Sequence, residues 1–124
     1  MQKSLLISML MLLLASCGQS YNSNSGDIAA YEPIEGIDAS TPDGARLLVA
    51  YKAFQPKCFS CHSGYADYKT SEQWVNAGLV TPGMPSTSTV YTILKNAGGR
   101  MPPDPVAQLT TEEFEAVEAW ISGM

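Results

Sequence analysis

The chain of 124 residues has few of the side chains that build a structural zinc site or a nucleic-acid surface. Its single histidine, His62, and the nearby Cys58 and Cys61 give three ligands, whereas a structural zinc normally needs four. No second cluster of cysteine and histidine exists to complete such a site. Lysine and arginine total 7 against 12 aspartate and glutamate, a formal net charge of -5. This balance disfavours nucleic-acid binding, which depends on a basic surface.

The sequence also lacks an apolar run of the roughly 20 residues that a membrane-spanning helix needs. A shorter run extends from Leu5 to Leu14, after the basic Lys3 and before small residues and Cys17. A short apolar stretch with a basic start and a small-residue end is typical of a secretory signal. Residues 1–16 are therefore predicted to be a cleaved signal peptide.

The end of this signal has a specific pattern. Residues 14–17, Leu-Ala-Ser-Cys, resemble the lipobox of bacterial lipoproteins. In that family the cysteine becomes the new N-terminus and carries lipid. The resemblance thus implies lipidation of Cys17 and a protein anchored to a membrane on the periplasmic side of the cell envelope. Gly18 stands where lipoproteins of the inner membrane tend to carry Asp, which favours the outer membrane. The alternative is an ordinary signal peptide with an incidental cysteine.

A change of composition divides the mature chain into a linker and a domain. Residues 19–26 are polar and of low complexity, and Pro33 and Gly36 punctuate the stretch after them. Residues 17–41 are therefore predicted to be a flexible, disordered tether. Residues 42–124 are predicted to form one small folded domain, which has a thin core for its size.

The predicted domain shows helical periodicity and no sustained alternation of apolar and polar residues, so an all-α fold is expected. Thr41 is placed to cap the first helix and Pro42 to occupy its first position. Pro56 is expected to end this helix. Residues 71–77 are predicted to form a short helix in an otherwise irregular stretch.

Two further helices are predicted in the second half of the domain. Residues 86–96 show helical spacing, and two glycines stand at positions 98 and 99 to stop the helix. The last helix has capping-box spacing from Thr110 to Glu113, and Gly123 stands just beyond its expected end. No internal repeat is present.

Cys58, Cys61 and His62 form the most informative pattern, C-x-x-C-H, which is typical of c-type haem attachment. Two cysteines at this spacing bond the two vinyl groups of a haem, and the adjacent histidine donates a ring nitrogen to the iron. One covalent haem c is therefore predicted. An exported, oxidising setting would also permit a Cys58–Cys61 disulfide. A thioredoxin-like redox pair needs an αβ scaffold, for which the strand pattern is missing.

The second axial ligand cannot be a histidine from this chain, so a methionine thioether is the next candidate. Met84, Met101 and Met124 remain once the signal is removed. Met101 is favoured because it lies 39 residues after His62 and precedes two prolines that restrict the loop. Met84 is the runner-up, and Met124 is terminal. A vacant site, a lysine or a water completes the alternatives.

With these residues placed, residues 44–124 resemble a class I cytochrome c. In that family the first and last helices cross beside the haem, and an aromatic such as Phe54 often precedes the first cysteine by four residues. Ala50 stands where many members have glycine at the helix crossing. A narrower likeness is to a bacterial subgroup with five ordered elements, here Trp74-Val75, Pro82-Gly83, 88–94, Met101-Pro102-Pro103 and Trp120-Ile121-Ser122-Gly123.

The resemblance implies a small helical fold wrapped around one haem, with His62 and Met101 as axial ligands. Because both axial positions are filled, we expect an electron carrier and not an enzyme. The expected partners are a redox donor, a redox acceptor and, through the lipid, a membrane. Arg100 is a candidate partner for a haem propionate or a solvent-facing charge. A gas sensor or peroxide-reacting protein with a labile sixth ligand is the alternative function, and a lipoprotein without haem is a third.

Overall fold

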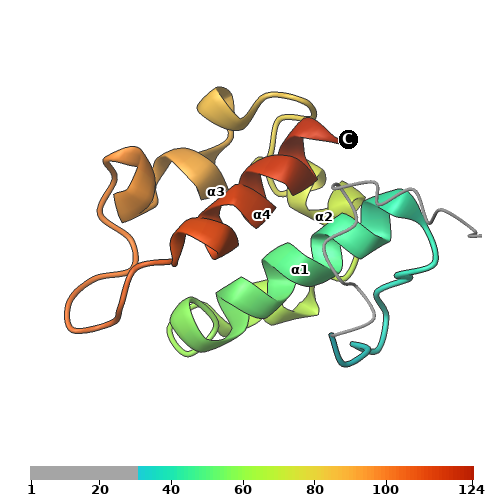
Figure 1. The fold of residues 1–124 in the computed structure, drawn as a ribbon, viewed down its shortest axis with the longest axis horizontal. Coiled ribbons are helices and arrows are strands. Elements are labelled where there is room, and N and C mark those ends of the chain that lie inside the picture. Colours follow the sequence, from blue (N-terminus) through green and yellow to red (C-terminus); the bar gives the residue numbers. More distant parts are fainter. Residues whose placement is uncertain (1–30) are drawn as a thin grey trace, which may run out of the picture.

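A computed structural model describes residues 31–124 of the chain, and helices are the regular elements of this part (Figure 1). The all-α prediction is confirmed for these residues, where the one β-type pairing is an isolated bridge between Leu94 and Met101. No helix among them has the length and apolar character needed to cross a membrane. The predicted signal peptide 1–16 and the predicted lipidation site Cys17 lie outside the described residues.

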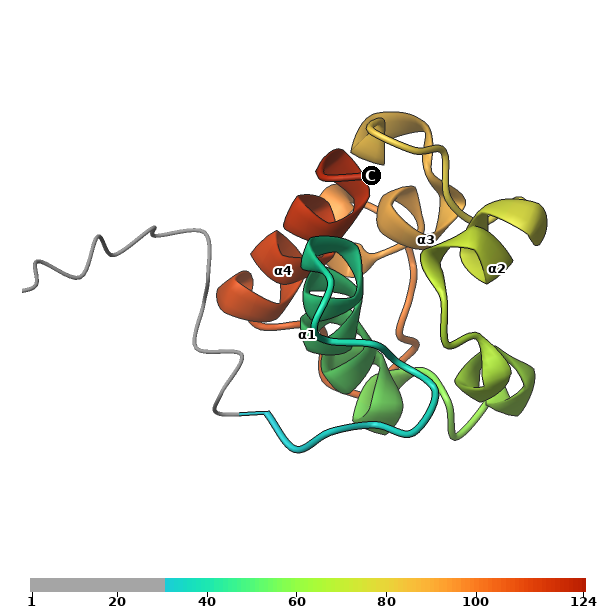
Figure 2. The same ribbon diagram turned by 90° about the vertical axis from the view of Figure 1, so that its right-hand side faces the viewer.

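Two long helices, α1 and α4, pack against each other, and α2 and α3 lie to one side of this pair (Figure 2). Three turns of 3-10 helix separate the shorter elements. In chain order the elements are α1 (Pro42–Lys57), η2 (Ser63–Asp67), α2 (Ser71–Asn76), η3 (Pro85–Thr87), α3 (Thr89–Thr92), η4 (Lys95–Ala97) and α4 (Thr111–Ser122).

Helix α1 begins as predicted but ends later. The Thr41 side chain accepts a hydrogen bond from the Gly44 N–H at 3.0 Å, and Pro42 is the first helical residue. Pro56 does not end the helix, which continues through Lys57. Proline removes its own N–H donor, but the Cys58 N–H still reaches the Phe54 carbonyl at 2.8 Å, so the last turn closes around Pro56.

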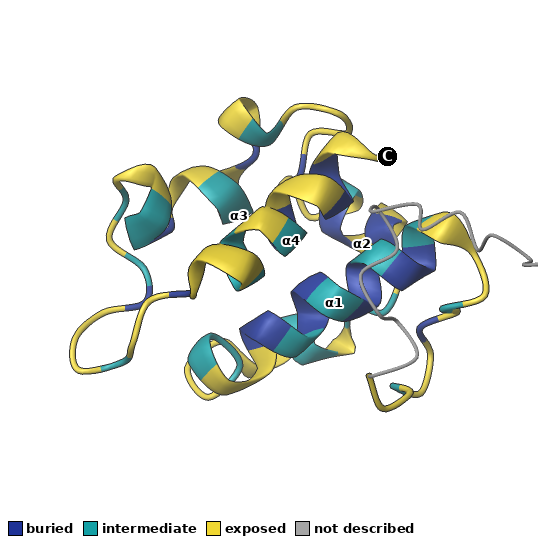
Figure 3. Ribbon diagram, in the orientation of Figure 1, coloured by how far each residue is buried: buried dark blue, intermediate teal, exposed yellow. Residues whose placement is uncertain are grey.

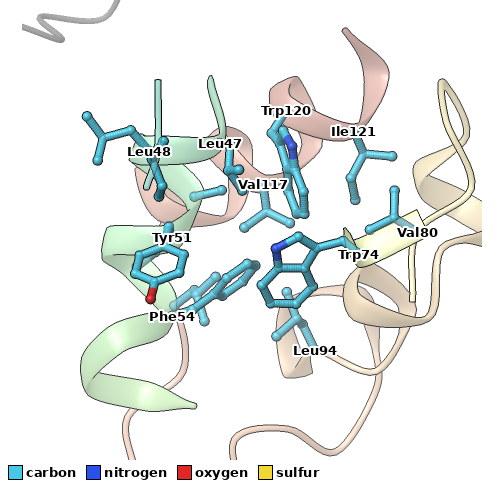
Figure 4. Close-up of a cluster of buried hydrophobic side chains, with 14 residues drawn as sticks. Leu47, Leu48, Tyr51, Phe54, Trp74, Val80, Leu94, Val117, Trp120 and Ile121 are labelled. Atoms are coloured by element: carbon cyan, nitrogen blue, oxygen red, sulfur yellow. The ribbon is translucent and has the colours of Figure 1, made fainter. Parts of the chain in front are cut away.

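The core lies between α1, α4 and α2, and Figure 3 shows the buried positions concentrated on α1. Three rings meet at its centre (Figure 4): the Trp74 ring centroid is 5.5 Å from that of Phe54 and 5.6 Å from that of Trp120. Ala50 is fully buried, in line with the small residue expected near a close helix crossing. The buried Trp120 indole donates to the Ser71 hydroxyl at 2.8 Å, which joins α4 to α2.

The helix predicted over residues 86–96 is wrong, because the structure divides this stretch into η3, α3 and η4. The buried Ser88 interrupts it with an extended backbone, ψ 120°. Its hydroxyl accepts from the Thr81 N–H at 2.9 Å and donates to the Met84 carbonyl at 2.9 Å. Serine that bonds to loop backbone in this way competes with helix formation. A second break comes at Leu94, which is also extended, ψ 143°.

The described end of the predicted tether, residues 31–41, packs against the domain. Ile37 is buried, and Ile34 and Ala39 contact the same core. The Thr41 hydroxyl donates to the Asp38 carbonyl at 3.0 Å and links this segment to the start of α1. The ordered structure therefore begins before residue 42, because two isoleucines bury apolar surface there. The earlier part of the predicted tether lies outside the described residues.

Helix α4 begins with the predicted capping box and ends at Ser122, with Gly123 as its C-cap. The Thr110 side chain accepts from the Glu113 N–H at 3.2 Å, and Glu113 accepts from the Thr110 N–H at 2.7 Å. Glu113 also forms an ion pair with Lys57, which joins the end of α1 to the start of α4. Partial burial by itself raises the pKa of Glu113, but the bonds from Lys57 and Thr110 outweigh it and hold this pKa below its usual value.

Replacing Glu113 with glutamine is therefore expected to destabilise the protein at neutral pH by about 1 kcal/mol, from the lost ion pair and the weakened cap. A carboxyl with a lowered pKa stabilises the fold above its ordinary value of 4.5, and this contribution is lost as the pH falls through the lowered value. Denaturant unfolding at pH 7 and at pH 3 measures the difference. The matched control is Glu115→Gln, an exposed acid on the same helix; equal losses for the two variants at pH 7 would contradict the prediction.

Candidate functional site

An apolar cavity of about 350 Å³ lies beside the core, a volume in the range of roughly 300–1,000 Å³ that is common for ligand and cofactor sites. Its walls come from the end of α1, the turn after it, α3 and the loop after η4. No aspartate or glutamate is among the lining residues, which are Phe54, Lys57, Cys58, Phe59, Cys61, His62, Tyr65, Trp74, Leu79, Thr89, Val90, Ile93, Leu94, Met101, Pro102, Pro103 and Val106.

The C-x-x-C-H pattern forms a tight turn at one wall of this cavity. Cys58 caps α1, and its carbonyl accepts from the N–H groups of Cys61 at 3.2 Å and His62 at 2.8 Å. The turn brings all three side chains to the cavity, and no disulfide joins Cys58 to Cys61. The described residues contain no group of three or more His, Cys, Asp or Glu side chains placed to hold a metal ion by themselves.

Partial burial makes the Cys58 thiol a weak nucleophile. Burial raises the pKa of the Cys58 thiol to about 11, against the opposing influence of Lys57. A reactive cysteine in a redox protein needs a lowered pKa, because the thiolate is the nucleophile. At neutral pH the half-buried Cys58 thiol is therefore protonated.

His62 lies at the exposed side of the cavity, and its ring stacks on Tyr65 with centroids 5.4 Å apart and planes 13° from parallel. The His62 carbonyl accepts from the Tyr65 N–H at 3.0 Å, so η2 begins directly after the histidine. The imidazole thus borders the cavity, with an aromatic neighbour on one face.

Met101 reaches the same cavity from a segment far along the chain. It is half-buried, and the next residue, Pro102, is buried. Met84, the runner-up, is 50% exposed and does not line the cavity. Met124 packs against the core at the end of the chain and does not line the cavity either. Of the three methionines, the geometry therefore favours Met101 as the thioether that faces a bound group.

Trp74 acts as a wall of the cavity. It is 1% exposed, and its indole N–H donates to the Tyr68 carbonyl at 3.2 Å, so this donor already has a partner. Arg100 is exposed and does not line the cavity. The charged side chain at the cavity is Lys57, which pairs with Glu113.

Several lining residues had no signal in the sequence. Leu79 and Val106 lie in loops, where apolar residues have no regular period. Phe59 could have been found from its place between the two cysteines, since a side chain inside the C-x-x-C-H turn lies near the cavity. The remaining wall residues become neighbours only through the fold.

The side chains at the cavity fit the predicted haem. Two thiols, an imidazole and a thioether are the groups that a c-type haem uses, and the other walls are almost entirely apolar. Comparison of the chain with protein-family models, with curated proteins and with solved structures gives no match.

Proposed function

We propose that this chain is a monohaem c-type cytochrome that carries single electrons between redox proteins of the bacterial cell envelope. The observation that supports the proposal is the convergence of Cys58, Cys61, His62 and Met101 on one apolar cavity. The first three come from one turn, but Met101 comes from a loop 39 residues later. A disulfide or a redox pair formed by the two cysteines would not account for a methionine at the same cavity.

In this proposal each residue of the site has a distinct role. Cys58 and Cys61 would hold the haem through thioether bonds, and the His62 imidazole and the Met101 thioether would bind its iron. The haem supplies an iron that cycles between its ferrous and ferric forms. A thioether ligand favours the ferrous form and so raises the potential, and the apolar walls act in the same direction.

Cys61, His62 and Ile93 are exposed at the cavity, so an electron can enter and leave there through a small, transient contact with each partner. Lipid on Cys17 would hold the domain at a membrane surface and raise its rate of encounter with membrane partners. With both His62 and Met101 bound to it, the iron would carry electrons without a position for substrate.

The test is a pyridine haemochrome assay on protein purified from the membranes of a bacterium that matures c-type haem. The expected result is one haem per chain that stays attached after denaturation. A Cys17→Ser variant is the matched control, and it should keep the haem but leave the membrane fraction. Colourless wild-type protein, with its thiols free or joined to each other, would contradict the proposal.

A further inference from the structure

The main chain holds Met101 on both sides of its Cα atom. The Lys95 N–H donates to the Met101 carbonyl at 2.7 Å. In the opposite direction, the N–H groups of Arg100 and Met101 donate to the Ile93 carbonyl at 2.8 and 2.9 Å. Together these bonds form the isolated bridge between Leu94 and Met101. The chain therefore turns back after residue 95, and its main chain at Met101, the proposed ligand, is bonded to residues 93 and 95.

Gly99 makes this return possible. A Cβ atom at position 99 would lie 2.1 Å from the Ile93 carbonyl oxygen and 2.2 Å from its carbon. Any other residue must push away the carbonyl that accepts from Arg100 and Met101. The neighbouring Gly98 differs, since it has a positive φ of +88° but a Cβ there would meet nothing within 4 Å. Gly98 turns the chain, and Gly99 permits the close approach.

We propose that Gly99 and the Lys95 N–H form a backbone clamp on Ile93 and Met101 that positions the Met101 thioether. The inference rests on the proposed function and goes beyond it by assigning residues that touch neither haem nor iron. Methionine is flexible, with three rotatable side-chain bonds, so a firm sulfur ligand needs a fixed Cα. A side chain that is oriented by supporting contacts binds its metal less tightly when those contacts are weakened.

The Lys95 side chain is not the source of this positioning. Its ammonium pairs with Asp104 at 2.6 Å, but the Asp104 side chain is 94% exposed. Exposed ion pairs contribute little to stability. The N–H group, in contrast, lies within the bridge that carries Met101.

Two variants test the clamp, one on the N–H side of Met101 and one on its carbonyl side. Gly99→Ala displaces the Ile93 carbonyl, and Lys95→Pro removes the N–H and places a ring against the Met101 carbonyl. Lys95 is the first residue of η4, and Leu94 before it is extended, φ -69° and ψ 143°, so the local backbone accepts proline. We therefore expect both variants to keep their helices, which circular dichroism would check.

In the haem-loaded ferric protein, both variants should lose the sulfur-to-iron charge-transfer band. Imidazole, an added ligand that competes with the thioether, should bind about tenfold more tightly, the change expected when about one hydrogen bond no longer supports Met101. The midpoint potential should fall in both variants, because a weaker thioether favours the ferrous iron less.

The controls separate positioning from general stability. Gly98→Ala strains a left-handed residue without a clash, so it should lower the unfolding temperature but keep the band and the imidazole affinity. Lys95→Gln loses the ion pair, keeps the N–H, and should behave like the wild type. Equal loss of the band in these controls would overturn the clamp.

The remaining outcomes are also distinct. If wild type shows the band but Gly99→Ala and Lys95→Pro retain both the band and the wild-type imidazole affinity, the clamp is wrong and the proposed function stands. If wild-type protein carries no covalent haem, the proposed function fails and the clamp fails with it. Because the variants act on opposite sides of Met101, either one that keeps its helix content is sufficient.

Discussion

Replacement of Met101 by alanine is expected to lower the midpoint potential by on the order of 0.1 V, since axial ligands set haem potentials over a range of about 0.8 V. The thioether that favours ferrous iron is lost, and neither Met84 nor Met124 lines the cavity to replace it. Met101 lines the cavity and its main chain is held in place, so the deletion leaves an opening at the proposed iron site. Redox titration of the purified protein measures the shift.

The same variant should gain a reactive site. In the wild type the ferrous protein is expected to bind carbon monoxide slowly and incompletely, whereas Met101→Ala should bind it quickly and completely at neutral pH. Quick, complete binding by the wild type would instead support the gas-sensing alternative, in which the sixth position is labile.

Met84→Ala is the matched control for both measurements. Met84 is 50% exposed and outside the cavity, so its loss should change neither the potential nor the binding of carbon monoxide. If the two variants exchanged their effects, the ligand assignment would be wrong even though the protein is a cytochrome.

The double variant Cys58→Ser with Cys61→Ser is expected to be colourless and largely unfolded at 25 °C. Without haem, water would enter the cavity of about 350 Å³ and the apolar side chains that line it would lose their contacts. Small domains have a free energy of unfolding of about 5–15 kcal/mol in total. The proposed covalent haem would therefore supply an apolar centre that the thin core of this domain lacks.

Far-ultraviolet circular dichroism during heating measures this effect, after any loosely bound haem has been washed away. Ser60→Ala is the matched control, because Ser60 lies between the two cysteines and is exposed. It should keep both the haem and the wild-type unfolding temperature. A double variant that melts cooperatively at the wild-type temperature would show that the domain does not need the group that we place in its cavity.

Residues close together in the sequence were enough to predict the local structure. The cap at Thr41 and the capping box of Thr110 and Glu113 both depend on groups that reach backbone within four residues. Such contacts form wherever the local chain allows them, so pattern and structure agree. Apolar periodicity likewise sufficed for the all-α class.

The local rules failed where another contact outweighed them. Pro56 stays inside α1 because the turn after it closes on Phe54, and Ser88 breaks the helix predicted over 86–96 because its hydroxyl bonds to Thr81 and Met84. Ile37 belongs to the core because the folded α1 offers it an apolar surface. A propensity is a weak preference per residue, and one buried contact exceeds it.

The cavity itself depended on the folded chain. Sequence spacing offered Met84 and Met101 as rivals, and it contained no sign that Gly99 contacts Ile93 or that Val106 reaches the wall. These residues become neighbours because α1 and α4 pack together and the chain that connects them lies on one side of this pair. Short-range chemistry thus specified the groups that could hold a haem, while long-range packing, which brings together residues 39 positions apart, selected which methionine lines the cavity.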